Sequence, residues 1–252
     1  MSGNPLNALG MATSLSLPTA EKRFLNERHN GDAPFKMLLH ESEIEFAVQR
    51  IADGINLRFD PPTSKPLLLV GILTGAFVFV SDLCKRLTVP HEVMFIQASS
   101  YTGQQQGEMR ILSEIIPSKI NGRHVILLDE LFDNGHTMQT MKEFLIRHPD
   151  LDLEPSDIET CVLFSKRSGT EVAQPDVVGI PNLPPLWLVG YGLDDNGDKR
   201  GWPHLFAIPK PEGFARARED AIFETEECYD ANAYAKLRHE ILDKSLFLNV
   251  YV

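Results

Sequence analysis

The sequence predicts an α/β fold, with a twisted and mostly parallel sheet that carries helices on both faces. Short apolar runs alternate along the chain with segments whose apolar residues recur at helical spacing. One run, at residues 125–128, has four apolar residues in succession, which is typical of a strand buried on both faces. The length of 252 residues suits one domain with additions at its ends.

The elements are predicted in the following order. Residues 41–56 carry apolar side chains at helical spacing, and the Pro-Pro-Thr-Ser sequence at 61–64 predicts a turn. Residues 101–109 show no apolar period and predict a mobile loop. Strands are predicted at residues 67–73, 93–98, 125–128, 160–165, 177–179 and 187–191, with a returning strand within 110–116, and further helices at 77–87, 138–147 and 231–246.

Composition excludes several classes of protein. The net charge of −11 argues against a nucleic-acid binder, which normally shows a basic face. Cys84, Cys161 and Cys228 form neither a disulfide framework nor a metal-ligand spacing, so reduced thiols are expected. The longest apolar stretch, residues 67–80, is interrupted by polar residues and glycines and is too short to span a membrane. With no secretory signal evident, a cytoplasmic location is expected.

The segment after the central apolar run is the strongest indication of function. Asp129 and Glu130 follow that run, Asp133 comes three residues later, and a small-residue turn at 134–137 leads into a predicted helix. Open α/β sheets bind ligands at the carboxyl ends of their strands, and N–H groups at a helix start bind phosphate. The segment therefore suits a sugar phosphate. Two alternatives stay open: the acids are ordinary caps and loop residues, or the chain is a receiver-type domain that holds Mg²⁺.

Four segments, in order and at similar spacing, resemble the type I phosphoribosyltransferases, and in particular their hypoxanthine-guanine branch. Residues 129–137 resemble the ribose-phosphate signature, 71–77 the pyrophosphate loop, 100–101 the start of the mobile loop, and 162–167 with 186–194 the purine-binding end.

The resemblance covers residues 35 to 211 approximately and implies the fold of that family, with a small hood region built from the chain ends. It predicts an N-terminal extension at 1–32, a phosphoribosyltransferase domain at 33–211 and a helical C-terminal extension at 212–252.

The resemblance implies an enzyme of purine salvage. It would transfer the 5-phosphoribosyl group of 5-phospho-α-D-ribosyl 1-diphosphate to N9 of hypoxanthine, guanine or xanthine, and would release pyrophosphate. The cofactor would be Mg²⁺, and the assembly a homodimer or homotetramer. A phosphoribosyltransferase for another base and a non-enzymatic nucleotide sensor or RNA-binding regulator are the alternatives, although the acidic balance argues against RNA.

The implied ribose-phosphate residues are those of the central segment. Asp129 and Glu130 would accept hydrogen bonds from the ribose hydroxyls and touch Mg²⁺, although the family order is Glu then Asp. Asp133 would exchange a proton with the purine N7, its alternative role being a helix N-cap. The 5′-phosphate loop would consist of Asn134, which replaces a threonine, and of Gly135, His136 and Thr137.

The diphosphate would lie against Leu73, Thr74 and Gly75, a loop in which the family commonly has a cis peptide and a basic residue where Thr74 stands. The alternative is an ordinary strand-to-helix turn. Asp194 would hold a second Mg²⁺, and Arg200 would contact the diphosphate. Ser100 and Tyr101 would close over the site and exclude water.

The purine would be held by three residues of the purine-binding end. Lys166, with Arg167 in reserve, would donate to the O6 of a 6-oxopurine, which excludes adenine. Trp187 would stack on the ring, its alternative being a core or interface position. Leu188 would offer backbone groups to the purine edge.

Overall fold

The computed structural model describes residues 24, 35–60, 65–102, 106–166, 174–208 and 231–245, with backbone alone at 99–102, 106–109, 231 and 243–245. Most of both predicted extensions, together with Arg167 and Cys228, lies outside these residues. None of the helices in the described part of the chain is long and apolar enough to cross a membrane.

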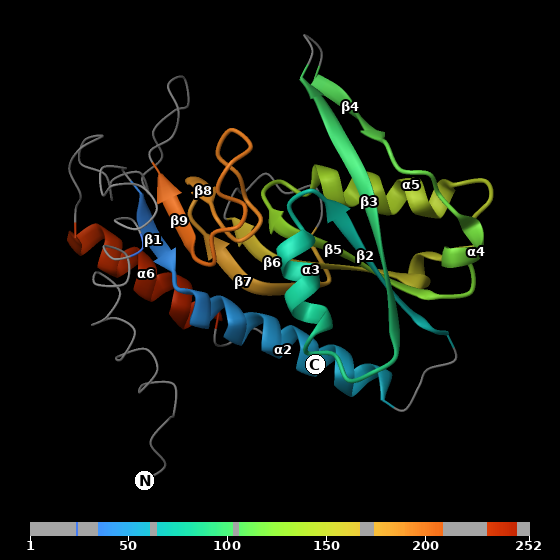
Figure 1. Cartoon of the computed structure of the whole chain (residues 1–252), viewed down its shortest axis with the longest axis horizontal. Coiled ribbons are helices and arrows are strands. Elements are labelled where there is room, and N and C mark those ends of the chain that lie inside the picture. Colours follow the sequence, from blue (N-terminus) through green and yellow to red (C-terminus); the bar gives the residue numbers. More distant parts are fainter. Residues whose placement is uncertain are drawn as a thin grey trace.

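The main sheet has six strands in the order β4-β3-β2-β5-β6-β7 (Figure 1). Every neighbouring pair is parallel except β3 and β4, which are antiparallel. The strands are β2 (Leu67–Leu73), β3 (His91–Thr102), β4 (Gln106–Ile111), β5 (His124–Phe132), β6 (Ile158–Lys166) and β7 (Val177–Leu183). The predicted α/β fold is therefore confirmed.

Helices cover both faces of this sheet because its central strands are apolar on both sides. In β2, Leu67 and Leu69 pack into the core beneath α2 (Glu41–Phe59) and α3 (Phe77–Cys84). The residues between and after them, Leu68, Val70 and Ile72, point to the core beneath α5 (His136–Arg147). Two short helices, α4 (Pro117–Ile120) and the 3₁₀ turn η1 (Pro155–Asp157), complete the connections.

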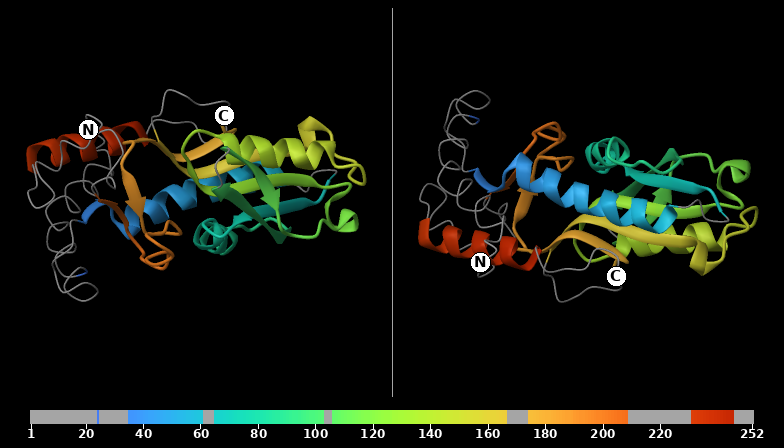
Figure 2. Two further views of the ribbon diagram at one scale, coloured as in Figure 1. Left: turned by 90° about the horizontal axis from the view of Figure 1, so that it is seen from above. Right: turned by 90° about the horizontal axis from the view of Figure 1, so that it is seen from below.

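A second, antiparallel sheet forms one end of the molecule and corresponds to the predicted hood. Its order is β1-β9-β8, with β1 at Lys36–Leu39, β8 at Trp187–Val189 and β9 at Leu205–Ile208. Figure 2 shows α2 running from this sheet along the main sheet. Helix α6 (Ala231–Ser245) lies at the same end of the molecule, against β7 and the start of α2. One face packs an aromatic cluster that includes Phe35, Trp202, Phe206 and, from the N-terminal segment, Phe24.

The helix α6 is fastened to the start of α2 by a buried ion pair. The Arg238 guanidinium donates to the Glu43 carboxylate at 3.1 Å and to the Leu38 carbonyl at 2.6 Å. Glu43 also accepts from the His40 backbone N–H, as part of the capping box of α2. Leu237 and Ile241 join the core beneath α2. The C-terminal helix is thus packed as an integral part of the fold.

Beyond shifts in element ends and two short unpredicted helices, the structure differs from the sequence-based prediction in the following places. The segment 101–109, predicted as a loop, contributes backbone to β3 and β4 at its two ends. β5 continues to Phe132, so that Asp129 and Glu130 lie within the strand and not after it. β1 and β9 were not predicted, because four-residue strands that pair across the whole chain leave too short a pattern in the sequence.

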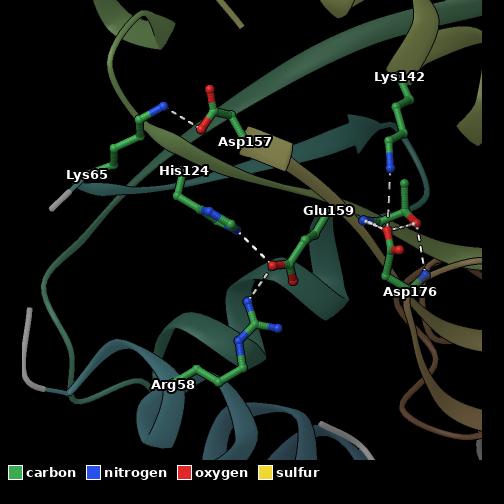
Figure 3. Close-up of polar contacts among 8 residues, drawn as sticks. Arg58, Lys65, His124, Lys142, Asp157, Glu159 and Asp176 are labelled. Carbon is green, nitrogen blue, oxygen red and sulfur yellow. Dashed lines mark hydrogen bonds and ion pairs between the residues drawn. The ribbon is translucent and has the colours of Figure 1, made fainter. Parts of the chain in front are cut away.

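The amino-terminal edge of the main sheet carries paired charges (Figure 3). Glu159 accepts from His124 at 2.9 Å and also pairs with Arg58. Burial alone would raise the pKa of Glu159, but these two donors hold that pKa at about 2. Asp157 pairs with Lys65. Charges at this edge are therefore compensated within the protein itself.

Candidate active site

A cavity opens at the opposite edge of the sheet, where β2 and β5 end and α5 begins. The residues that line it include members of three of the four predicted site segments, together with Arg200. They are Ile72, Leu73, Thr74, Gly75, Ala98, Asp129, Glu130, Asn134, His136, Thr137, Thr140, Asp194 and Arg200. The parallel register of β2 with β5 explains this gathering, because their carboxyl ends meet at one edge.

Two adjacent carboxylates form one wall of the cavity. Burial and the negative charge of Glu130 raise the pKa of Asp129 well above its usual range. No ion pair to Asp129 or Glu130 is present among the residues that the structure describes. The wall therefore favours a ligand that brings hydroxyl donors or positive charge.

The loop at residues 73–75 is packed tightly against this wall. The peptide bond between Leu73 and Thr74 is cis, as the resemblance led us to expect. A Cβ atom at Gly75 would lie 1.7 Å from Glu130 Oε1, so that only glycine fits there. A Cβ at Gly192 would lie 2.2 Å from the Gly75 carbonyl oxygen, and Gly192 has a φ of +100°. Glycine at both positions lets three chain segments meet at the cavity.

The start of α5 forms the opposite wall. Gly135, with φ of 86°, is the N-cap residue, and Asn134 Oδ1 accepts from the His136 N–H at 3.1 Å. The first N–H groups of a helix lack intrahelical partners, and this end of the helix attracts anions. His136 and Thr137 both line the cavity. The segment has the geometry of an anion-binding turn.

Asp194 and Arg200 reach the cavity from the turn that follows β8. Arg200 Nη2 lies 2.6 Å from Asp194 Oδ1, and Nη1 donates to the Gly192 carbonyl at 2.7 Å. A single guanidinium thus fixes the turn while it presents positive charge to the cavity. Among the described residues that line this cavity, Arg200 is the only arginine or lysine.

Other predicted site residues lie outside the cavity lining. Asp133 has a side chain that is 61% exposed and lies 3.4 Å from Lys166 Nζ, so these two form a pair of their own. Asp133 is not the N-cap of α5, which removes that alternative. Trp187 packs against the aromatic cluster of the second sheet, and Leu188 points into the main core.

For Ser100 and Tyr101, the structure gives the backbone alone, within β3. Their predicted closure over the site stays a prediction.

Sequence reasoning missed three lining residues: Ile72, Ala98 and Thr140. Thr140 lies one helical turn after His136 and therefore on the same face of α5, a spacing that would have identified it. Ala98 was predicted to lie in a strand but carries no polar atom in its side chain, and Ile72 is apolar, so neither signalled a site.

The residues present fit a divalent cation without forming a closed metal centre. No cluster of three or more His, Cys, Asp or Glu side chains placed to hold a metal occurs in the described ranges. Asp194 is already paired with Arg200. Asp129 and Glu130, in contrast, are oxygen donors whose mutual repulsion a cation would relieve, and Mg²⁺ commonly uses one or two carboxylates beside water and substrate oxygens.

Residues 35–196 match the family described as "Phosphoribosyl transferase domain". The chain belongs to this family. It is 33% identical over 173 residues to a hypoxanthine phosphoribosyltransferase of Salmonella typhimurium, a match that covers 68% of this chain and 93% of that one. A hypoxanthine-guanine phosphoribosyltransferase of Aquifex aeolicus is 31% identical over 176 residues, covering 69% and 94%.

Solved phosphoribosyltransferases share the fold. A hypoxanthine phosphoribosyltransferase of Staphylococcus aureus superposes with a TM-score of 0.60 at 27% identity, covering 74% of this chain and 97% of that one. The Trypanosoma cruzi enzyme in complex with the product IMP gives 0.60 at 29% identity, covering 71% and 96%. The helix α6 begins 35 residues after the end of the family match at residue 196.

Proposed function

We propose that this phosphoribosyltransferase acts in purine salvage. It transfers the 5-phosphoribosyl group of 5-phospho-α-D-ribosyl 1-diphosphate to N9 of hypoxanthine or guanine, and xanthine is a third candidate base. The products are the nucleoside monophosphate and pyrophosphate. The observation that carries the proposal is the cavity itself, which joins two ribose-type carboxylates, a phosphate-type helix start and the loop at 73–75. Relatives that carry the name hypoxanthine phosphoribosyltransferase support the choice of base.

In this proposal the cavity binds the donor through three groups of residues. Asp129 and Glu130 accept hydrogen bonds from the ribose hydroxyls. The backbone N–H groups of residues 134–137 and the Thr137 hydroxyl hold the 5′-phosphate. The loop at 73–75 and Arg200 receive the diphosphate, and Arg200 supplies the positive charge that Thr74 lacks.

The base would approach from the side of Asp133 and Lys166. Lys166 donates to a purine O6, and Asp133 takes or returns the N7 proton. The 3.4 Å contact between them supports their acting on one ring, because O6 and N7 are neighbours on a purine. Trp187 and Leu188 complete the base site, although the structure shows both packed away from the cavity lining.

Mg²⁺ is the proposed cofactor, held by Asp129 or Glu130 on the ribose side and by Asp194 on the diphosphate side. Its chemistry would be to neutralise the charge of the leaving pyrophosphate. We further propose that the protein is cytoplasmic and assembles as a homodimer or homotetramer. Light scattering of the purified protein would test the state of assembly.

A spectrophotometric assay tests the function. Purified protein, Mg²⁺ and the diphosphate donor are mixed with hypoxanthine, guanine, xanthine or adenine in turn, beside the Asp133→Asn variant. We expect turnover of 6-oxopurines, little with adenine, and a large loss in the variant. Saturable donor binding without turnover of any base would overturn the enzymatic proposal and favour a nucleotide sensor on the same fold.

A further inference from the structure

The turn that carries Asp194 and Arg200 is joined to the loop at 73–75 by one buried tyrosine. Tyr191 is 2% exposed, and its hydroxyl donates to Asp82 Oδ2 at 2.8 Å. Asp82 lies in α3, the helix that starts directly after that loop. The hydrogen bond therefore links the two segments that would hold the diphosphate from opposite sides.

The backbone around Tyr191 is held in an uncommon conformation. Its φ is 49°, between Gly190 at 92° and Gly192 at 100°. A bulky residue in the left-handed region is strained and persists only where its surroundings fix it. The Tyr191 N–H donates to the Trp202 carbonyl at 2.8 Å, and the Gly192 N–H donates to the Arg200 carbonyl at 2.9 Å. The turn is thus shaped so that the Tyr191 ring points back into the core.

The same turn presses directly on the cavity loop. The Gly192 position allows no Cβ because the Gly75 carbonyl lies against it, and Gly75 in turn lies against Glu130. The Gly192 carbonyl accepts from Arg200. A shift of Tyr191 would therefore move Gly192, Arg200 and the loop at 73–75 together.

We propose that Tyr191 is a positioning residue, whose hydrogen bond to Asp82 sets the separation between the loop at 73–75 and the Asp194–Arg200 turn. It acts through its neighbours and does not touch the substrate. The inference rests on the proposed function and adds a residue to it. The Tyr191 hydroxyl governs the affinity for the diphosphate part of the phosphoribosyl donor and leaves the affinity for the base largely unaffected.

The test uses the full-length protein and three variants. Tyr191→Phe keeps the ring and removes the hydrogen bond, Asp82→Ala removes the acceptor, and Asp82→Asn keeps an acceptor oxygen. We expect Tyr191→Phe and Asp82→Ala each to raise the donor KM about tenfold, with the KM for the base changed less than twofold. The double variant should equal either single one, and Asp82→Asn should recover most of the donor affinity.

Lys85→Ala is the matched control, because Lys85 is the exposed ion-pair partner of Asp82 and lies on the surface. It should leave both KM values unchanged. Equal rises in both KM values, or additive effects in the double variant, would overturn the positioning role.

The two hypotheses fail in different ways. Calorimetric titration of each variant with inorganic pyrophosphate and Mg²⁺ measures the subsite without turnover. If the wild type binds pyrophosphate but turns over no base, the proposed function fails while the positioning role is still measured. If Tyr191→Phe binds pyrophosphate as tightly as the wild type, the positioning role fails whatever the activity.

Discussion

The two edges of the main sheet treat buried charge in opposite ways. At the amino-terminal edge, Glu159 lies between Arg58 and His124, and its pKa falls to about 2. At the carboxyl edge, Asp129 lies beside Glu130 without a described cation, and its pKa rises well above the usual range. A self-compensated cluster favours the folded state, whereas an uncompensated one favours a ligand. The same sheet thus separates its stabilising charges from its binding charges.

The largest expected effect is at the binding edge. Asp129→Asn removes one of two repelling carboxylates and one acceptor for the donor. We expect a loss in donor kcat/KM of about 10- to 100-fold. The ligand-free melting temperature should rise by about 2–4 °C, for a gain of roughly 1 kcal/mol. Steady-state kinetics and calorimetry measure both quantities. A variant that is less stable than the wild type would break the comparison.

The opposite result is expected at the amino-terminal edge. Glu159→Gln removes the negative charge that Arg58 and His124 face, and should lower the free energy of unfolding by about 2–3 kcal/mol with kcat/KM unchanged. Because the folded pKa of Glu159 lies below its ordinary value of 4.5, its contribution is present above pH 4.5 and disappears towards pH 2. Urea unfolding at several pH values should show that the free energy of unfolding falls less at acid pH in the variant than in the wild type. An unchanged pH slope would contradict this assignment.

His204 extends the comparison of the two edges, because it is a buried histidine in the second sheet whose pKa is lowered. Burial, with His40 beside it, lowers the pKa of His204 to about 4, and its Nδ1 accepts from the Glu41 N–H at 3.0 Å. Protonation therefore favours the unfolded chain, and stability should fall as the pH drops from 6.5 towards 4. His204→Asn keeps an acceptor, and it should reduce the loss of unfolding free energy between pH 6.5 and pH 4 by about 1–2 kcal/mol.

Donor binding provides the control for His204. Binding of the phosphoribosyl donor should raise the unfolding free energy of wild type and His204→Asn by the same amount, since no cavity residue is changed. If the donor fails to protect His204→Asn, the second sheet takes part in donor binding, and the comparison must include it.

The smallest effect belongs to the ion pair of Lys65 and Asp157, in which the lysine is exposed and the carboxylate is buried. Lys65 is 43% exposed, and its pairing lowers the pKa of Asp157. Asp157→Asn should cost less than about 1 kcal/mol, because solvent screens such a pair. Thermal melts of Asp157→Asn and Glu159→Gln, measured side by side, give the ratio of the two stability losses. A cost equal to that of Glu159→Gln would mean that exposure of the cation does not set the strength of these pairs.

Much of the site followed from the sequence because its residues stand in short continuous segments. The acids at 129–130 and the turn at 134–137 followed from the rule that ligands bind where parallel strands end, whereas the loop at 73–75 was named from its resemblance to the family. Each of these segments contributes to the cavity lining. The assignment at Trp187 depended on which way one side chain of a three-residue strand points. That direction is set by the partner strand β9, which the sequence pattern did not reveal.

The fold of the chain ends escaped prediction for a related physical reason. β1 pairs with β9, some 170 positions later, so no local period could mark either strand. Helix α6 was predicted from its apolar spacing, yet its docking also uses Arg238, which reaches the Glu43 carboxylate near the start of the domain. Pairings over such a separation belong to the tertiary structure, and local sequence propensity does not predict them.

The pair formed by Glu43 and Arg238 also has a consequence for biosynthesis. Glu43 leaves the ribosome early and Arg238 almost two hundred residues later, after every strand of the main sheet has been made. Until then the Glu43 carboxylate has no guanidinium partner from α6, and the core surface that receives Leu237 and Ile241 remains open to water. A nascent chain can therefore assemble the carboxyl edge of its main sheet before α6 arrives, and the last of the described helices then closes the core.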